Sequence, residues 1–138
     1  PKSRPRLDKD DNNDVFETNH RLACQLALEC IVLLKNENNI LPLAKNTRMA
    51  VIGEFAVDSR YQGLGSSHCT PTRVDHAMDA LRNYSSSIDY AAGYHAQATE
   101  DALQPELVEE AIQVAKKANV VVMFLGLPEI LESEGFDR

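Results

Sequence analysis

Residues 132–138, ESEGFDR, crowd three carboxylates, a glycine and an arginine directly behind an apolar run. Glu134 stands out because Gly135 follows it, and glycine permits a sharp turn that can direct the preceding carboxyl into a cleft. A carboxyl that is partly withdrawn from water and close to another carboxylate can serve as a general acid. Asp137 and Arg138 can pair and brace the loop. From charge alone, a solvated acidic loop is the simpler interpretation, so a second feature must support the catalytic one.

A second segment with chemical potential is the glycine-rich run GLGSS at residues 63–67. Gly63 and Gly65 let the backbone approach a ligand, and the hydroxyls of Ser66 and Ser67 can donate and accept hydrogen bonds. The run matches neither of the phosphate-binding patterns G-x-G-x-x-G and G-x-x-x-x-G-K-[ST]. Taken by itself, it is more simply interpreted as a flexible loop.

The elements that must position these segments follow from the apolar pattern. Short apolar runs predict three strands, at residues 49–53, 88–91 and 120–125. Apolar residues at helical spacing predict three helices, which begin at the Asp14 to Glu17 capping box, at Thr70 with Pro71, and at Pro105. The first helix runs to Cys30, and residues 31–34 are expected to add a short strand. The alternation of strands and helices requires right-handed crossovers, so we predict an α/β fold whose largely parallel sheet has helices on both faces.

In an open parallel sheet, the residues that do chemistry gather beyond the carboxyl ends of the strands. The glycine-rich loop follows the strand at 49–53 and the acidic segment follows the strand at 120–125, so both leave the sheet at the same edge. We therefore expect them to face one site. On these residues alone, the main alternative is a nucleotide- or phosphate-binding Rossmann-like module, although its fingerprint is missing and the acidic segment would repel phosphate. A non-catalytic sugar-binding or interaction domain is a further alternative.

Composition narrows the class of partner. The chain has 138 residues, of which 43% are hydrophobic and 25% charged, as is typical of a globular domain. Its net charge is −7, with 21 acidic and 14 basic residues, which argues against a nucleic-acid surface. No apolar run approaches the length of about 18 residues that a membrane span needs. A neutral substrate or a protein partner fits this chain better than a nucleic acid or a membrane.

The cysteines and histidines give no indication of a metal or a cofactor. Cys24, Cys30 and Cys69 are odd in number and form no C-x-x-C pair, which favours thiols in a reducing compartment and a cytoplasmic location. Cys24 and Cys30 fall among the apolar residues of the first helix, so we expect both to be buried. The histidines lack the spacing of a ligand set; they are His20, His68, His76 and His95.

Five segments resemble, in order, the second domain of glycoside hydrolase family 3, the β-glucosidase group. The segments are HRLACQLALECIVLLKNENNILPL, MAVIGEFA, YQGLGSS, VVVMFLGL and ESEGFDR. The resemblance covers residues 18–138 and implies the N-terminal part of an α/β sandwich that is built on a six-stranded sheet. It also implies an upstream (β/α)8 barrel that carries an aspartate nucleophile and is absent from this chain. Residues 1–17 are then expected to be the linker from that barrel.

The resemblance also implies a function and a set of site residues. The glutamate before glycine in the family's loop is the acid/base catalyst, which corresponds to Glu134, and a serine of the glycine-rich loop contacts the sugar, which corresponds to Ser66 or Ser67. Leu64 between the two glycines leaves open which serine does so. The expected reaction is retaining hydrolysis of terminal non-reducing β-D-glucosyl residues from a β-glucoside or oligosaccharide. The chain alone is expected to be inactive, and its incomplete sheet to leave an edge that can pair with a second copy into a homo-oligomer.

Overall fold

The computed structural model of the chain describes residues 9–97, 104–129, 131–132 and 134–135, with the backbone alone at 9–13. The chain divides into two compact units, Pro1–Pro42 and Leu43–Arg138. None of the helices in the described residues is both long enough and apolar enough to cross a membrane.

The first unit consists of helix α1, Lys9–Cys30, followed by an irregular segment and the short 3-10 helix η1, Glu37–Asn39. Helix α1 begins at Lys9 and not at the predicted capping box, because apolar periodicity marks only the amphipathic part of a helix and does not register polar turns before it. The short strand predicted at residues 31–34 is also wrong. These residues have no strand geometry and are exposed, since an isolated apolar run has no ladder to join.

The turn that ends the first unit is closed by an asparagine side chain. The amide of Asn36 donates to the carbonyl of Leu41 and accepts from its N–H, each at 3.0 Å. Asn38 and Asn39 lie within this turn at φ values of 55° and 52°. Asparagine tolerates this left-handed region better than most residues, so the run NENN at residues 36–39 favours the turn.

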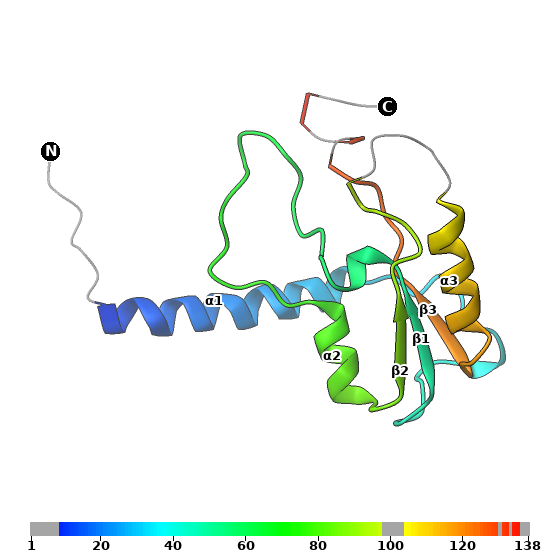
Figure 1. Cartoon of the computed structure of the whole chain (residues 1–138). Coiled ribbons are helices and arrows are strands. Elements are labelled where there is room, and N and C mark those ends of the chain that lie inside the picture. Colours follow the sequence, from blue (N-terminus) through cyan, green and yellow to red (C-terminus); the bar gives the residue numbers. More distant parts are fainter. Residues whose placement is uncertain (1–8, 98–103, 130, 133, 136–138) are drawn as a thin grey trace, which may run out of the picture. The chain divides into compact units, whose positions relative to one another are not determined.

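The second unit is built on three parallel strands in the order β2-β1-β3 (Figure 1). The strands are β1, Met49–Ile52, β2, Ile88–Ala91, and β3, Val120–Met123. The predicted parallel sheet and α/β fold class are confirmed, although β3 ends two residues earlier than expected. All four residues of the central strand β1 are buried, as is typical of a strand that is covered on both faces.

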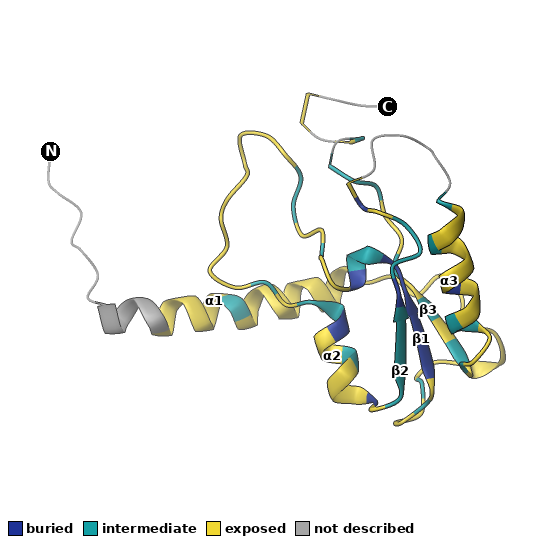
Figure 2. Ribbon diagram, in the orientation of Figure 1, coloured by how far each residue is buried: buried dark blue, intermediate teal, exposed yellow. Residues whose placement is uncertain are grey.

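Helix α2, Ala77–Tyr84, and helix α3, Pro105–Ala115, cover opposite faces of this sheet (Figure 2). On one face Met78 of α2 packs with Val51, and on the other Ala111 of α3 packs with Ile52. Val51 and Ile52 are neighbours in β1, and successive side chains of a strand point to opposite faces. The helices therefore lie on the two faces, as predicted.

The start of α3 at Pro105 matches the prediction, but the start of α2 does not. Helix α2 begins at Ala77, with His76 in an extended conformation as its N-cap residue. The predicted start, Thr70 with Pro71, belongs to the irregular segment that follows the glycine-rich loop. A threonine followed by proline suits a helix start locally, but it also suits an extended chain, and the tertiary contact of His76 described below favours the extended form.

Candidate active site

The two segments that the sequence singled out leave β1 and β3 side by side. Ile52 and Met123 are paired in the parallel ladder, and the N–H of Phe124 continues it by donating to the carbonyl of Ile52 at 2.8 Å. Gly53 follows β1 at a φ of +123°, and a Cβ there would lie 2.2 Å from the carbonyl oxygen of Phe124. Only glycine permits this close approach of the two chains, which sets the starting direction of both segments.

The structure brings Glu134 and Ser66 together. The backbone N–H of Ser66 donates to Oε2 of Glu134 at 2.7 Å, and the hydroxyl of Ser66 lies 3.0 and 3.2 Å from the two carboxylate oxygens. Ser67 is exposed, and among the described residues only Ser66 hydrogen-bonds to Glu134. Glu134 is itself exposed in this chain. The acidic segment and the glycine-rich loop thus meet at one place, beyond the carboxyl ends of the strands.

The contact depends on Gly65, at which a Cβ would lie 2.1 Å from Oε2 of Glu134 and 2.6 Å from its Cβ. Gly65 also has a φ of +119°, which side-chain-bearing residues rarely adopt. Gly63 differs, because a Cβ there would meet no atom within 4 Å. Gly135 has a φ of +74° and open space around it, so it provides the turn behind Glu134. Ser133, Asp137 and Arg138 lie outside the described residues, including the predicted pairing of Asp137 with Arg138.

A side-chain amide closes the glycine-rich loop. Nε2 of Gln62 donates to the carbonyl of Cys69 at 2.9 Å, and Oε1 of Gln62 accepts from the N–H of Cys69 at 3.2 Å. The loop is therefore pinched at its base by a pair of hydrogen bonds like those between two strands. The sequence gives no signal for Gln62, since nothing in its local spacing indicates a partner seven residues away.

Arg60 is a second residue that the sequence analysis missed. Its guanidinium donates to the carbonyl of Leu127 and, at 2.9 Å, to the carbonyl of Glu132. Both carbonyls belong to the segment that carries Glu134, more than 60 residues further along the chain. The bracing that the sequence suggests, a pair of Asp137 with Arg138, lies outside the described residues and stays a prediction.

Glu54, at the start of the loop after β1, is a second carboxylate at this edge of the sheet. It accepts from the N–H of Ala96 and lies 3.7 Å from Nδ1 of His95, with 30% of its side chain exposed. Tyr94 stands beside it and donates its hydroxyl to the carbonyl of Phe124 at 2.5 Å. Burial raises the pKa of Tyr94 above its ordinary value of 10.0, and the charge of Glu54 adds to the shift. Glu54 thus joins the loop after β2 to the residues that follow β1, and Tyr94 joins that loop to the end of β3.

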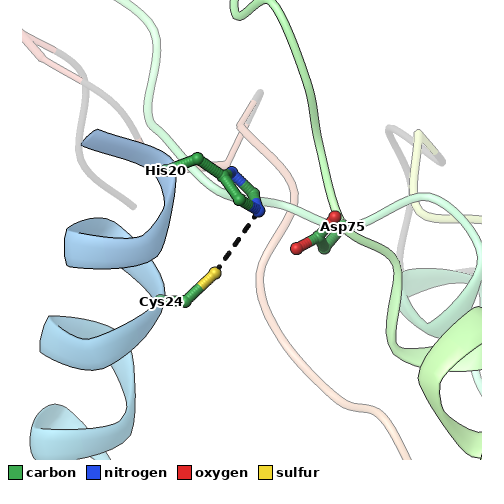
Figure 3. A group of neighbouring side chains, drawn as sticks. All are labelled: His20, Cys24 and Asp75. Atoms are coloured by element: carbon green, nitrogen blue, oxygen red, sulfur yellow. Dashed lines mark hydrogen bonds between the residues drawn. The ribbon is translucent and has the colours of Figure 1, made fainter. Parts of the chain in front are cut away.

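The two cysteines of α1 are not placed as the sequence suggested. Cys24 and Cys30 are exposed on α1, so the prediction that both are buried is wrong, because apolar spacing alone does not say which partner covers a helix face. Nε2 of His20 lies 3.5 Å from Sγ of Cys24, one helical turn away (Figure 3). Asp75, which Figure 3 also draws, belongs to the second unit. A pair of ligand atoms falls short of the three or four protein ligands of a zinc site, so the pair in α1 defines no metal site.

Comparison with known proteins identifies the class to which this fold and site belong. The Glycosyl hydrolase family 3 C-terminal domain matches residues 31–138, and the chain belongs to this family. The crystal structure of a Bifidobacterium adolescentis glycoside hydrolase family 3 β-glucosidase matches with a TM-score of 0.78 and 46% identity. The match covers 89% of this chain and 18% of that one.

Three named relatives illustrate the range of the family. The chain is 45% identical over 125 residues to thermostable β-glucosidase B of Acetivibrio thermocellus, covering 88% of this chain and 16% of that protein. It is 43% identical over 146 residues to exo-α-(1→6)-L-arabinopyranosidase of Bifidobacterium longum, covering 99% and 19%. It is 35% identical over 129 residues to probable β-D-xylosidase 7 of Arabidopsis thaliana, covering 91% and 16%. The chain thus spans less than a fifth of the length of these relatives.

Proposed function

We propose that this chain is part of the second domain of a retaining β-glycosidase, and specifically of a β-glucosidase. In this proposal Glu134 is the acid/base catalyst. The observation that carries the proposal is the contact of Glu134 with Ser66 beyond the carboxyl ends of the strands. Membership of family 3 and the name of the Acetivibrio thermocellus relative support a glycosidase. Hydrolysis would release terminal non-reducing β-D-glucosyl residues.

The proposed chemistry needs two carboxyl groups about 5 Å apart. Glu134 protonates the leaving oxygen as the sugar is transferred to an aspartate, and then removes a proton from the water that releases the sugar. The aspartate lies in an upstream (β/α)8 barrel, for which the much greater length of the relatives leaves room. An exposed Glu134 suits this arrangement, because the barrel and the bound sugar would cover it. Ser66 or Ser67 contacts the sugar in the first subsite.

Replacement of Glu134 by glutamine in the full-length protein tests the role of the carboxyl. Glutamine cannot transfer the proton, so we expect Glu134→Gln to slow the hydrolysis of cellobiose more than that of an aryl glucoside, whose leaving group departs without protonation. Added azide is expected to restore turnover of the aryl glucoside, because it attacks the glycosyl-enzyme without base assistance. Steady-state kinetics with both substrates measure the difference.

Glu132→Gln is the matched control, because its exposed side chain lies on the same segment and only its backbone carbonyl is used in the contacts described. It is expected to keep the parent's rates on both substrates. Equal rates for Glu134→Gln and the parent would contradict the proposed role of Glu134.

The sugar in the first subsite is a separate part of the proposal, since the relatives are named for three different sugars. Aryl β-D-glucoside, β-D-xyloside and α-L-arabinopyranoside, compared by kcat/KM on the full-length protein, decide among them. We expect the glucoside to be fastest. Faster hydrolysis of the arabinopyranoside would overturn the β-glucosidase assignment, although the protein would still be a glycosidase.

The cytoplasmic location also remains a proposal that rests on the odd number of cysteines.

A further inference from the structure

We propose that Arg60 is the positioning residue of the acid/base catalyst, an inference that rests on the proposed role of Glu134. The side chain of Arg60 reaches from the loop after β1 to the segment after β3 and donates to two of its carbonyls, at Leu127 and Glu132. Glu132 is two residues before Glu134. The segment is therefore held by its backbone just before the residue that Ser66 holds by its carboxylate.

Arg60 is well placed to act as a fixed point, because the chain just before it is anchored. Asp58 donates its N–H to the carbonyl of Glu54 at 2.9 Å, in the turn that follows β1. Ser59 donates its N–H to Nδ1 of His76 at 3.4 Å, and its hydroxyl lies 3.3 Å from the same nitrogen. His76 is the N-cap residue of α2. The base of the Arg60 side chain is thus tied to both β1 and α2.

The two carbonyls bound by Arg60 lie at the ends of a turn. Within it, the N–H of Leu131 donates to the carbonyl of Pro128 at 3.0 Å. The turn is closed by its own hydrogen bond, and the guanidinium joins its two ends. Holding both ends fixes the direction in which the chain continues toward Glu134. The planar guanidinium has five donors in a rigid fork, so it can serve two carbonyls at once.

The loss of Arg60 is expected to affect position more than folding. Arg60 is exposed and lines a pocket of about 120 Å³, which Pro128 and Glu129 also line. Water can therefore solvate the carbonyls of Leu127 and Glu132 when the guanidinium is removed, and no buried polar group is left without a partner. A misplacement of about 1 Å in a catalytic group can nevertheless cost about 10²-fold in rate.

Kinetics of Arg60→Ala in the full-length protein test the inference. We expect kcat for cellobiose to fall by about 10²-fold, with a smaller fall for an activated aryl glucoside and little change in KM, because protonation of the leaving group is the step disturbed. Arg82→Ala is the matched control, since Arg82 is an exposed arginine of α2 whose ion pair with Asp79 spans one turn of that helix. It is expected to behave as the parent does. Equal kinetics for Arg60→Ala and Arg82→Ala would overturn the inference.

A double mutant separates an effect through Glu134 from a general structural effect. If Arg60 acts by positioning the carboxyl of Glu134, then adding Arg60→Ala to Glu134→Gln should lower the rate of cellobiose hydrolysis by no more than about a further twofold. A further loss as large as that of Arg60→Ala alone would refute the positioning role. Arg60→Lys keeps the charge but not the fork, so an intermediate rate is expected, and a rate equal to the parent's would also refute it.

If Arg60→Ala does not accumulate as folded protein, Arg60→Lys tests the inference in its place. The outcome is independent of the wider proposal, because a failure of the acid/base role would appear in Glu134→Gln itself. If Glu134→Gln shows the expected dependence on the leaving group while Arg60→Ala does not, only the inference about Arg60 fails.

Discussion

The contact between Glu134 and the glycine-rich loop depends on the absence of a single atom, the Cβ that any other residue would have at Gly65. A carboxylate that accepts hydrogen bonds from both the backbone and the hydroxyl of Ser66 must come very close to the chain. Gly65 makes this possible, because the space that a Cβ would occupy is filled by the side chain of Glu134. Sequence inspection attributes the same general freedom to both glycines of the run. The structure distinguishes them, and only the second is required for the contact.

Exchange of the two glycines for alanine tests this distinction. In Gly65→Ala the new methyl group overlaps Oε2 of Glu134, so the carboxyl must move, and we expect kcat for cellobiose to fall by about 10²-fold. Gly63→Ala meets open space and is expected to retain the parent's activity. Steady-state kinetics of the two full-length variants make the comparison. Similar losses in both would mean that loop flexibility, and not the close approach, is what matters.

At the scale of elements, apolar runs located all three strands of the sheet, although a fourth run, at residues 31–34, predicted a strand that does not form. Only the central strand β1 is buried along its whole length, as expected of a continuously apolar strand. Apolar spacing was insufficient for the start of helix α2, where the contact between His76 and Ser59 favours an extended chain that local sequence does not reveal. The same limit applies to the site. Glu134 could be found from its neighbour Gly135, whereas Arg60 could not, because its partners are two carbonyls that are far away in sequence and carry no side-chain signal.

The loop after β2 is joined to the end of β3 by Tyr94, and this contact should depend on pH. The folded pKa of Tyr94 is raised above 10.0, chiefly by burial. The unfolded chain therefore loses its proton first, so the stabilisation is complete below about pH 10 and is lost as the pH rises through the higher folded pKa. We expect the free energy of unfolding to fall above about pH 10, and to fall less steeply in Tyr94→Phe.

Urea unfolding of the full-length protein at several pH values from about 9 to 11 measures this difference in slope. Tyr84→Phe is the control for the lost hydrogen bond itself, because the hydroxyl of Tyr84 also donates to a backbone carbonyl, that of Leu43. Parallel curves for the parent and Tyr94→Phe would contradict the link between this tyrosine and stability. Tyr90, whose pKa is also raised by burial and by Glu54, accounts for a residual slope in the variant.

At the scale of the whole molecule, the proposed mechanism places one catalytic carboxyl, Glu134, in this chain and the second in an upstream barrel. The isolated chain of 138 residues is therefore expected to show no turnover of an aryl β-glucoside, even at high protein concentration. A chromogenic assay with the purified chain measures this. Turnover that Glu134→Gln abolishes would overturn the proposal that the nucleophile lies in another domain.

The sheet has open edges within the described residues, and β3 is one of them, with Val121 and Met123 exposed. Pairing of this edge with a second copy remains a prediction, since exposed strand edges are templates for association. Sedimentation of the isolated chain over a range of concentrations would detect it.

Two side chains that hold the loops around the site, Arg60 and Gln62, bind backbone atoms of their partners. Arg60 holds the carbonyls of Leu127 and Glu132, and Gln62 holds the peptide group of Cys69. Every residue type carries a backbone carbonyl, and every type but proline carries a backbone N–H, so most substitutions at Leu127, Glu132 and Cys69 are expected to leave these contacts in place. The side chains at these positions can therefore change while the two loops stay held.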